Sequence, residues 1–340
     1  MVPMDTDALQ AIVKRFEDVR VLVIGDLRLD IFIRGDLTRI SDEAPVPVLD
    51  FISETVRPGG AGNAISNIRA LGGDVVAVGV IGDDPEGRWL KTRLSETGAD
   101  TTGILTCRNR RTTQKTRIIA EKNQHHILRI DRNNSADIDT DSSDTLLKTI
   151  QGVIDGVDTI LISDYDDGMI TTEFLEELIP LAKSKDKTIV IDSKAAHFPD
   201  YRDVDIVKVS HQVASEITGI GIINETSLRN IGQWMLTQLG SNYVLITQGK
   251  DGMTLFDRRG DVFHIPSIAD ELKEATGVAD TVAAVLALSL SVDRTRMTEA
   301  AVLANTTAGI KVGKMGTATV SGDELLEKLA GPVVIRKIPN

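Results

Sequence analysis

The sequence has a single cysteine, Cys107, among its 340 residues. One thiol excludes an intrachain disulfide and a zinc site built from several thiolates, and it fits a reducing compartment. The longest apolar run, Thr281 to Val292, spans about 12 residues, whereas a membrane-spanning helix needs about 20. Residues 1–19 are interrupted by charged side chains and do not resemble a signal peptide. We therefore expect a cytoplasmic protein with no membrane partner.

Basic residues are also scarce relative to acidic ones. The 38 lysines and arginines face 50 aspartates and glutamates, so the net charge is −12. Such a chain repels phosphate backbones, which makes nucleic acid a poor partner. Hydrophobic residues make up 41% and charged residues 26%, a balance that supports a sizeable folded core. The length suggests two domains or one large α/β domain.

Short β-rich runs alternate with stretches of helical periodicity. The runs are Val19–Ile24, Val75–Val80, Thr159–Ile162, Thr188–Ile191, Ile206–Val209 and Tyr243–Thr247, and the helical stretches are Ala64–Leu71, Glu86–Glu96, Ser143–Ile154, Thr172–Lys185 and Ser227–Leu239. This alternation predicts a mostly parallel sheet covered by helices on both faces, with ligands beyond the carboxyl ends of its strands. No repeat or linker divides the chain, which favours one domain over residues 1–340.

Two segments interrupt this alternation, at about residues 31–56 and 112–131. Each alternates apolar and polar residues, as half-exposed antiparallel strands do. We expect the two segments to form one small inserted sheet, which would serve as a lid over the active site, as a dimer contact, or as both.

A first glycine-rich motif runs from Arg57 to Asn63 and precedes a helical stretch. Its glycines let a ligand approach the backbone closely, and Asn63 offers both a donor and an acceptor. A glycine-rich turn without function explains the motif equally well.

A second motif, Glu274 to Asp280, opens the apolar run. Free amides at a helix amino terminus form an anion site, and Asp280 beside them is a carboxylate able to accept a hydroxyl proton. The alternative is that Asp280 only caps the helix. A third, less specific motif, Leu245 to Gly252, runs from a strand into a turn where Thr247 and exposed amides would hold a nucleotide phosphate.

The order and spacing of these motifs resemble the ribokinase-like (PfkB) carbohydrate kinases, and within them the heptose 7-phosphate kinase group. The resemblance runs from about Arg20 to about Leu329. It is carried by Val23–Asp26 with Asp30, Arg39–Val48, Gly59–Asn63, Ser163–Tyr165, Ile191–Lys194, Ala304–Gly309 and Val312–Thr317. It implies a ribokinase-like α/β fold with a small β-sheet lid.

The resemblance also implies transfer of the γ-phosphoryl of ATP, with Mg²⁺, to a hydroxyl of a sugar or sugar phosphate. Asp280 would be the general base. Sugar hydroxyls would be bound by Asp30, Gly59, Gly60, Asn63, Asp164, Asp192 and Lys194, and an existing phosphate by Lys115, Arg117 and Arg129. ATP would be bound by Ser210, Thr247, Gly249, Gly252, Gly277, Val278, Ala279 and Asn305. The metal ligands are unassigned, and a homodimer is expected.

Three motifs depart from the family pattern. Gly-Ala-Gly-Asp becomes Gly277-Val278-Ala279-Asp280, Asn-x-x-Glu becomes Ser210-His211-Gln212-Val213, and the lysine of Asp-Tyr-x-Lys-Gly becomes Asp167. If position 279 needs a glycine-only backbone angle, or lies against the phosphate, Ala279 would strain or crowd the anion site.

The departures leave two hypotheses. The first is an active sugar kinase, and the second is a catalytically weakened binding or regulatory homologue. An oxidoreductase is rejected because no Gly-x-Gly-x-x-Gly follows the first strand. We expect any accompanying nucleotidyl transfer to occur on another chain, since only about ten residues follow Leu329.

Overall fold

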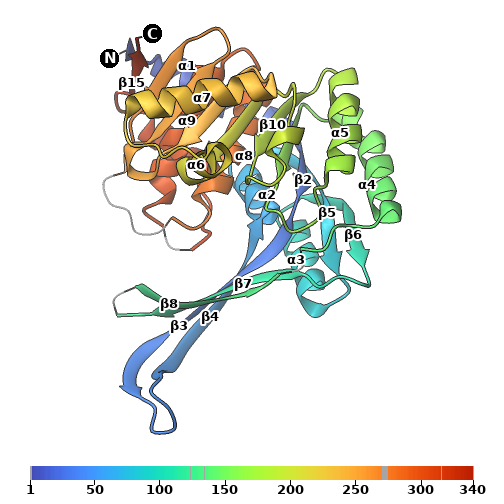
Figure 1. Cartoon of the computed structure of the whole chain (residues 1–340), viewed down its shortest axis with the longest axis vertical. Coiled ribbons are helices and arrows are strands. Elements are labelled where there is room, and N and C mark those ends of the chain that lie inside the picture. Colours follow the sequence, from blue (N-terminus) through green and yellow to red (C-terminus); the bar gives the residue numbers. More distant parts are fainter. Residues whose placement is uncertain (1, 123, 134, 270–274, 315, 340) are drawn as a thin grey trace.

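The computed structural model describes residues 2–339 except 123, 134, 270–274 and 315, and it contains two β-sheets (Figure 1). The strands are β1 (Val2–Pro3), β2 (Arg20–Gly25), β3 (Leu27–Ile40), β4 (Pro47–Gly60), β5 (Asp74–Gly82), β6 (Asp100–Cys107), β7 (Thr113–Ala120), β8 (His125–Arg132), β9 (Thr159–Ser163), β10 (Thr188–Asp192), β11 (Ile206–Ser210), β12 (Tyr243–Thr247), β13 (Met253–Asp257), β14 (Val262–Ile265) and β15 (Val334–Ile338). The larger sheet has 11 strands in the order β1-β15-β14-β13-β12-β11-β10-β9-β2-β5-β6. Along this order, neighbouring strands from β1 to β12 pair antiparallel, and neighbouring strands from β12 to β6 pair parallel.

Helices cover both faces of the large sheet. They are α1 (Thr6–Val13), α2 (Ala61–Ala70), α3 (Pro85–Glu96), α4 (Thr140–Val153), α5 (Thr172–Ser184), α6 (His211–Thr218), α7 (Glu225–Leu239), α8 (Val278–Val292), α9 (Met297–Lys311) and α10 (Gly322–Lys328). In β2, Val21 and Val23 join one buried apolar cluster with α2, α8 and α9, while Leu22 and Ile24 join another with α4, α5 and α7. This arrangement confirms the predicted ribokinase-like architecture of a mostly parallel sheet covered on both faces. No helix in the described part of the chain has the length and apolar character needed to cross a membrane.

The six predicted strands and the five predicted helices are all present, with ends shifted by a few residues. The sequence pattern did not predict strands β1, β6 and β13 to β15, or helices α1, α6, α9 and α10. Helix α9 lacks an apolar stripe because it buries polar side chains, among them Asn305, Thr306 and Thr307. The hydroxyls of Thr306 and Thr307 donate to the carbonyls of Val302 and Leu303, at 2.9 and 2.8 Å. These internal hydrogen bonds satisfy the buried hydroxyls, so the helix needs no polar face.

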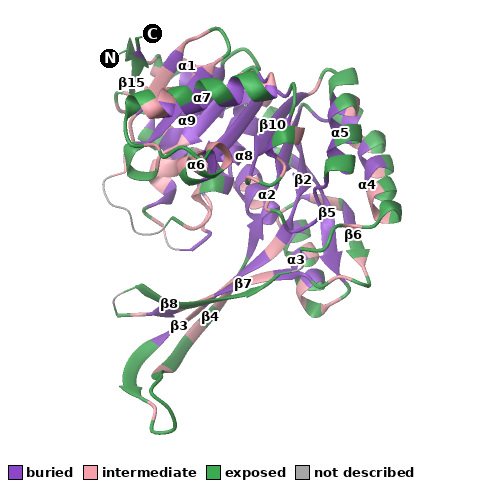
Figure 2. Ribbon diagram, in the orientation of Figure 1, coloured by how far each residue is buried: buried purple, intermediate pink, exposed green. Residues whose placement is uncertain are grey.

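The two interrupting segments pair into one small sheet, as predicted, in the order β4-β3-β7-β8. Its β3–β4 hairpin and its β7 and β8 strands project from the main body (Figure 1), and the far part of the hairpin is largely exposed (Figure 2). The strands are longer than predicted, since β3 begins at Leu27 and β4 ends at Gly60. The glycine motif is therefore the end of a strand of this sheet, followed directly by α2, and not a turn.

Glycines 59 and 60 let the small sheet join the main body closely. A side chain at Gly59 would place its Cβ 2.2 Å from an Asp30 carboxylate oxygen, and one at Gly60 would place its Cβ 2.6 Å from the Asp26 carbonyl. Gly60 also has φ 57° and ψ −133°, a combination open almost only to glycine. Both positions therefore require glycine for packing, independently of any ligand.

We expect Gly60→Ala to lower the free energy of unfolding by about 1–3 kcal/mol, because alanine is strained at this φ and its Cβ overlaps the Asp26 carbonyl. Gly152→Ala is the matched control. Gly152 is in α4 with open space around its Cα, so alanine there should be neutral or slightly stabilising. Urea denaturation measures both, and an unchanged stability for Gly60→Ala would contradict the packing argument.

Candidate active site

The first turn of α8 carries Asp280 into the interior. The helix begins at Val278, its cap is Gly277, and no side chain caps it, so Asp280 is not a capping residue. Asp280 is only 3% exposed. Its Oδ2 accepts a hydrogen bond from Asn63 Nδ2 of α2 at 2.7 Å, and its Oδ1 accepts one from the Tyr165 hydroxyl.

The environment of Asp280 keeps it near the protonation balance that a general base needs. Its pKa is raised to about 6, because burial and, to a smaller extent, the neighbouring Asp192 carboxylate raise it more than Arg28 and the hydrogen bonds from Asn63 and Tyr165 lower it. A carboxylate with this pKa is mostly ionised at neutral pH and still basic enough to accept a hydroxyl proton.

Backbone amides at the start of α8 are available to an anion. Within the described residues, the amides of Gly277, Ala279 and Asp280 have no hydrogen-bond acceptor, whereas Val278 N donates to the Ala275 carbonyl at 3.3 Å. Their direction along the helix axis favours negative charge. Gly277 has φ 79°, and a Cβ there would lie 2.6 Å from Asn63 Nδ2, so only glycine keeps both the amide and Asn63 in place.

The concern about backbone strain at Ala279 is wrong. Ala279 belongs to the regular helix α8 and is not among the described residues with positive φ, so its backbone suits any residue except proline. Its side chain is exposed and faces the cavity described next. Glu274 and Met315, which belong to two of the motifs named above, lie outside the described residues.

A cavity of about 480 Å³ lies beside the amino terminus of α8. Among its lining residues are seven of the eight expected to bind ATP, namely Ser210, Thr247, Gly249, Gly252, Val278, Ala279 and Asn305. The eighth, Gly277, directly precedes Val278. The structure thus brings residues from β11, β12, α8 and α9 together around one cavity.

Two of the cavity residues already have structural partners. Ser210 Oγ accepts from Val213 N at 3.2 Å and caps α6, and Asn305 Nδ2 donates to the Pro266 carbonyl at 2.8 Å. Val213, which occupies the family's glutamate position, is buried in the apolar cluster behind the sheet, and the cavity is instead lined by His211 and Gln212. The missing glutamate is therefore a difference in packing as well as in charge.

The acceptor side of Asp280 is lined by residues of β3, α2 and β10. Asp192 Oδ1 pairs with Lys208 Nζ at 2.6 Å, and Lys208 also donates to the Ala279 carbonyl at 3.3 Å. Nine buried side-chain polar atoms have no partner in the described part of the chain, and three of them belong to residues beside Asp280 or Gly277: Asp192 Oδ2, Arg28 Nε and Thr317 Oγ1. Buried polar groups without partners are rare in folded proteins, so these three atoms are candidates to bind a polar ligand.

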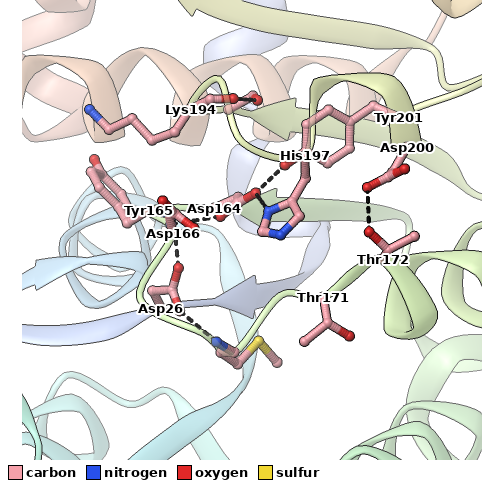
Figure 3. Close-up of polar contacts among 12 residues, drawn as sticks. Asp26, Asp164, Tyr165, Asp166, Thr171, Thr172, Lys194, His197, Asp200 and Tyr201 are labelled. Carbon is pink, nitrogen blue, oxygen red and sulfur yellow. Dashed lines mark hydrogen bonds and ion pairs between the residues drawn. The ribbon is translucent and has the colours of Figure 1, made fainter. Parts of the chain in front are cut away.

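Other predicted sugar-binding residues are engaged within the protein. Asp30 is buried and pairs with Arg117 at 2.5 Å. Asp164 contacts His197 Nδ1 at 2.7 Å and accepts from the Tyr201 hydroxyl (Figure 3). The hydrogen bond from His197 to Asp164 raises the pKa of His197, opposed by partial burial of the imidazole. Through these contacts Asp164 holds the loop after β9 in place. Lys194 is exposed, and its Nζ lies 5.4 Å from the centre of the Tyr165 ring.

The cations expected to bind an existing phosphate are on β7 and β8 and pair with carboxylates. Besides Arg117, Lys115 lies 3.3 Å and Arg129 2.9 Å from Asp131 oxygens. A phosphate at these residues would have to replace Asp30 or Asp131.

Sequence reasoning missed four residues that shape the site: Asp26, Arg28, Tyr165 and Lys208. Asp26 and Tyr165 belong to motifs that carried the resemblance but received no role. Lys208 offered a signal of its own, because a charged residue inside the apolar run Ile206–Val209 needs a buried partner.

Comparison with known proteins identifies the family. The pattern described as "pfkB family carbohydrate kinase" matches residues 20–323. The chain is 36% identical over 327 residues to the Bifunctional protein HldE of Syntrophotalea carbinolica, covering 96% of this chain and 66% of that protein. It is 38% identical over 311 residues to the Bifunctional protein HldE of Geobacter sulfurreducens, covering 92% and 63%. The chain thus spans about two thirds of the length of these relatives.

Solved structures agree on the fold at low sequence identity. The Arabidopsis thaliana ribokinase complexed with ribose and ATP superposes with a TM-score of 0.72 at 16% identity, covering 92% of this chain and 98% of that one. Phosphofructokinase-2 from Escherichia coli in complex with potassium gives 0.76 at 17% identity, covering 92% and 98%. With the family pattern matching most of its length and the fold agreeing, the chain belongs to the pfkB family of carbohydrate kinases.

Proposed function

We propose that residues 1–340 form one kinase domain that transfers the γ-phosphoryl group of ATP to a hydroxyl of a sugar phosphate, with Asp280 as general base. The observation that carries this proposal is the position of Asp280. It lies in the first turn of α8, directly after Ala279, which lines the cavity of about 480 Å³, and it is close to Asp192 and Arg28, each of which has a buried polar atom without a partner in the described part of the chain. The amides of Gly277, Ala279 and Asp280 likewise have no acceptor among the described residues. The resemblance to the heptose 7-phosphate kinase group makes a heptose phosphate the proposed acceptor.

The residues present fit a nucleotide triphosphate. The cavity combines apolar walls from Val278, Val282 and Val312 with polar groups of Ser210, Thr247 and Asn305. ATP with Mg²⁺ supplies an activated phosphoryl group whose charge is partly neutralised by the metal. No group of three or more His, Cys, Asp or Glu side chains that could hold a metal ion occurs in the described part of the chain, and the protein ligands of Mg²⁺ stay unassigned.

The chain's own residues would align the reactants and accept the proton. The acceptor hydroxyl would donate to Asp280, whose carboxylate takes its proton as the oxygen attacks the γ-phosphorus and the bond from that phosphorus to the leaving oxygen of ADP breaks. The amides of Gly277, Ala279 and Asp280, which have no acceptor among the described residues, would stabilise negative charge on the phosphoryl oxygens. Asn63, bonded to Asp280 Oδ2 and to the Gly277 carbonyl at 3.3 Å, keeps base and anion site in a fixed relation.

The existing phosphate of the acceptor would be bound at Arg117, Lys115 and Arg129. These cations reach the site from the small sheet, which we propose acts as a lid. Their present carboxylate partners hold them in place until a phosphate competes for them. The cytoplasm is the proposed compartment, since ATP is the donor.

The test of this function is phosphoryl transfer to a panel of sugars and sugar phosphates with ATP and Mg²⁺. Asp280→Asn should lower turnover by about 10²–10⁴-fold while sugar affinity, measured by calorimetry, changes little, because an amide has nearly the shape of the carboxylate. Asp186→Asn, at an exposed surface position paired with Arg294, is the matched control and should retain full turnover. Robust transfer by Asp280→Asn would exclude Asp280 as the base.

The weakened-homologue hypothesis makes a different prediction about the anion site. Because Ala279 has a helical backbone, we expect Ala279→Gly to leave turnover nearly unchanged. Gly277→Ala should lower turnover by about 10²-fold, because its Cβ would displace Asn63 from Asp280. Steady-state kinetics of the two variants distinguish an active kinase from a weakened homologue. A large gain in turnover on Ala279→Gly would support a crowded, weakened site.

We also propose that the small sheet forms a homodimer contact, because it exposes apolar side chains including Leu37, Ile40, Phe51 and Ile52. Phe51, 65% exposed, is the most exposed of these four. Phe51→Lys should shift a dimer toward monomer in analytical ultracentrifugation. Ile223→Lys, at an exposed apolar residue of the main body, should not. A strictly monomeric wild type at high concentration would refute the contact.

A further inference from the structure

The hydroxyl of Tyr165 contacts the proposed base directly. Tyr165 follows β9, and its hydroxyl donates to Asp280 Oδ1, the oxygen that Asn63 leaves free. The guanidinium carbon of Arg28 lies 3.8 Å from the centre of the tyrosine ring, close enough for a cation–π contact. The ring therefore has a fixed neighbour on its face as well as a fixed partner at its hydroxyl.

The backbone of Tyr165 is held by a second buried carboxylate. Asp26, 2% exposed, accepts a hydrogen bond from the amide of Tyr165 at 2.8 Å (Figure 3). It also accepts from the amides of Asp167 at 3.3 Å and Met169 at 3.2 Å. Asp26 lies in the link between β2 and β3, so the loop after β9 is tied to the end of the neighbouring strand β2. Three hydrogen bonds to one carboxylate leave the loop little freedom.

Asp164, the residue before Tyr165, is held from the other side. Its Oδ1 accepts from Asp166 N at 2.8 Å, and its Oδ2 contacts His197 and the Tyr201 hydroxyl (Figure 3). Asp166 has φ 59°, as the tight turn after Tyr165 requires. The loop thus fixes the position from which Tyr165 reaches Asp280.

Tyr165 remains a donor over the working pH range. Burial raises its pKa well above 10, and the negative charges of Asp280 and Asp192 raise it further, against the opposing effect of Arg28. A protonated phenol can donate to a carboxylate, and this hydrogen bond favours the ionised form of the acid. The charged groups that face this pair are Arg28 from β3, Asp192 from β10, Lys194 from the loop after β10 and Lys208 from β11, which is paired with Asp192.

We propose that Tyr165 is a positioning residue for the base: its hydroxyl holds one oxygen of the Asp280 carboxylate while Asn63 holds the other, which fixes the orientation in which Asp280 meets the acceptor hydroxyl. The proposal rests on the proposed function, in which Asp280 takes the proton. It assigns a role to the tyrosine of the Ser163–Tyr165 motif, for which the sequence suggested none.

The activity test compares Tyr165→Phe with Tyr243→Phe. Each variant removes one tyrosine hydroxyl, but the Tyr165 hydroxyl contacts Asp280, whereas Tyr243 lies at the start of β12, at the opposite end of that strand from Thr247 of the cavity. Loss of the Tyr165 hydrogen bond should raise the pKa of Asp280, so the acidic limb of the kcat/KM profile should move up by about one pH unit. We expect kcat to fall more than sugar KM rises. Tyr243→Phe should leave the limb in place, and an unmoved limb in Tyr165→Phe would overturn the proposal.

A second readout does not depend on activity. The pKa of Asp280 is raised in the folded protein, to about 6 against an ordinary 3.8, so the protonated carboxyl stabilises the native state at low pH and this contribution disappears as pH rises through 6. The Tm difference between the wild type and Asp280→Asn should therefore change between about pH 4 and 6. In the Tyr165→Phe background, the same difference should level off about one unit higher.

The two readouts separate the proposals. Absence of phosphoryl transfer in the wild type would refute the proposed function, while the stability window would still test the Tyr165 contact. Transfer that depends on Asp280, with no shift of either the kinetic limb or the stability window in Tyr165→Phe, would refute the role of Tyr165 alone.

Discussion

The buried carboxylate of Asp280 is the constraint around which the site is arranged. A charge removed from water at the start of α8 needs donors, and here Asn63 and Tyr165 supply them from two other elements. Each donor is itself fixed: Asn63 also reaches the Gly277 carbonyl, and Tyr165 is tied through its backbone to Asp26. Asp280, the amino terminus of α8 and the loop after β9 therefore form one connected hydrogen-bonded unit.

This unit explains why certain residues tolerate no replacement and others do. Gly277 must lack a side chain because Asn63 lies against it. Gly60 must lack one because the Asp26 carbonyl lies against that position. Ala279 has no such restriction, since it occupies an ordinary helical position. The departure from the family pattern at Ala279 is thus mild for the helix backbone, while the replacement at Val213, the sharper departure in the sequence, changes what packs behind the cavity beside α8.

Much of the fold was predictable because its elements obey local rules. The runs that became β2, β5, β9, β10, β11 and β12 are apolar and bounded by polar residues, as buried parallel strands are. The small sheet followed from its alternating pattern. Helix α9 escaped prediction because Thr306 and Thr307 satisfy their hydroxyls within the helix, so burial left no apolar stripe to read.

The sequence by itself determined the family, the parallel sheet with helices on both faces, the small inserted sheet and the choice of Asp280 as candidate base, because each depends on local periodicity or on a short motif with fixed spacing. Only the tertiary structure decided the partners. Sequence spacing does not show that Tyr165 and Asn63, which are distant from Asp280 along the chain, meet its carboxylate, that Lys208 pairs with Asp192, or that Asp164 turns to His197 and Tyr201. These contacts depend on how β3, α2, β9, β10 and α8 converge at the carboxyl edge of the sheet, and that convergence is a property of the packed chain as a whole.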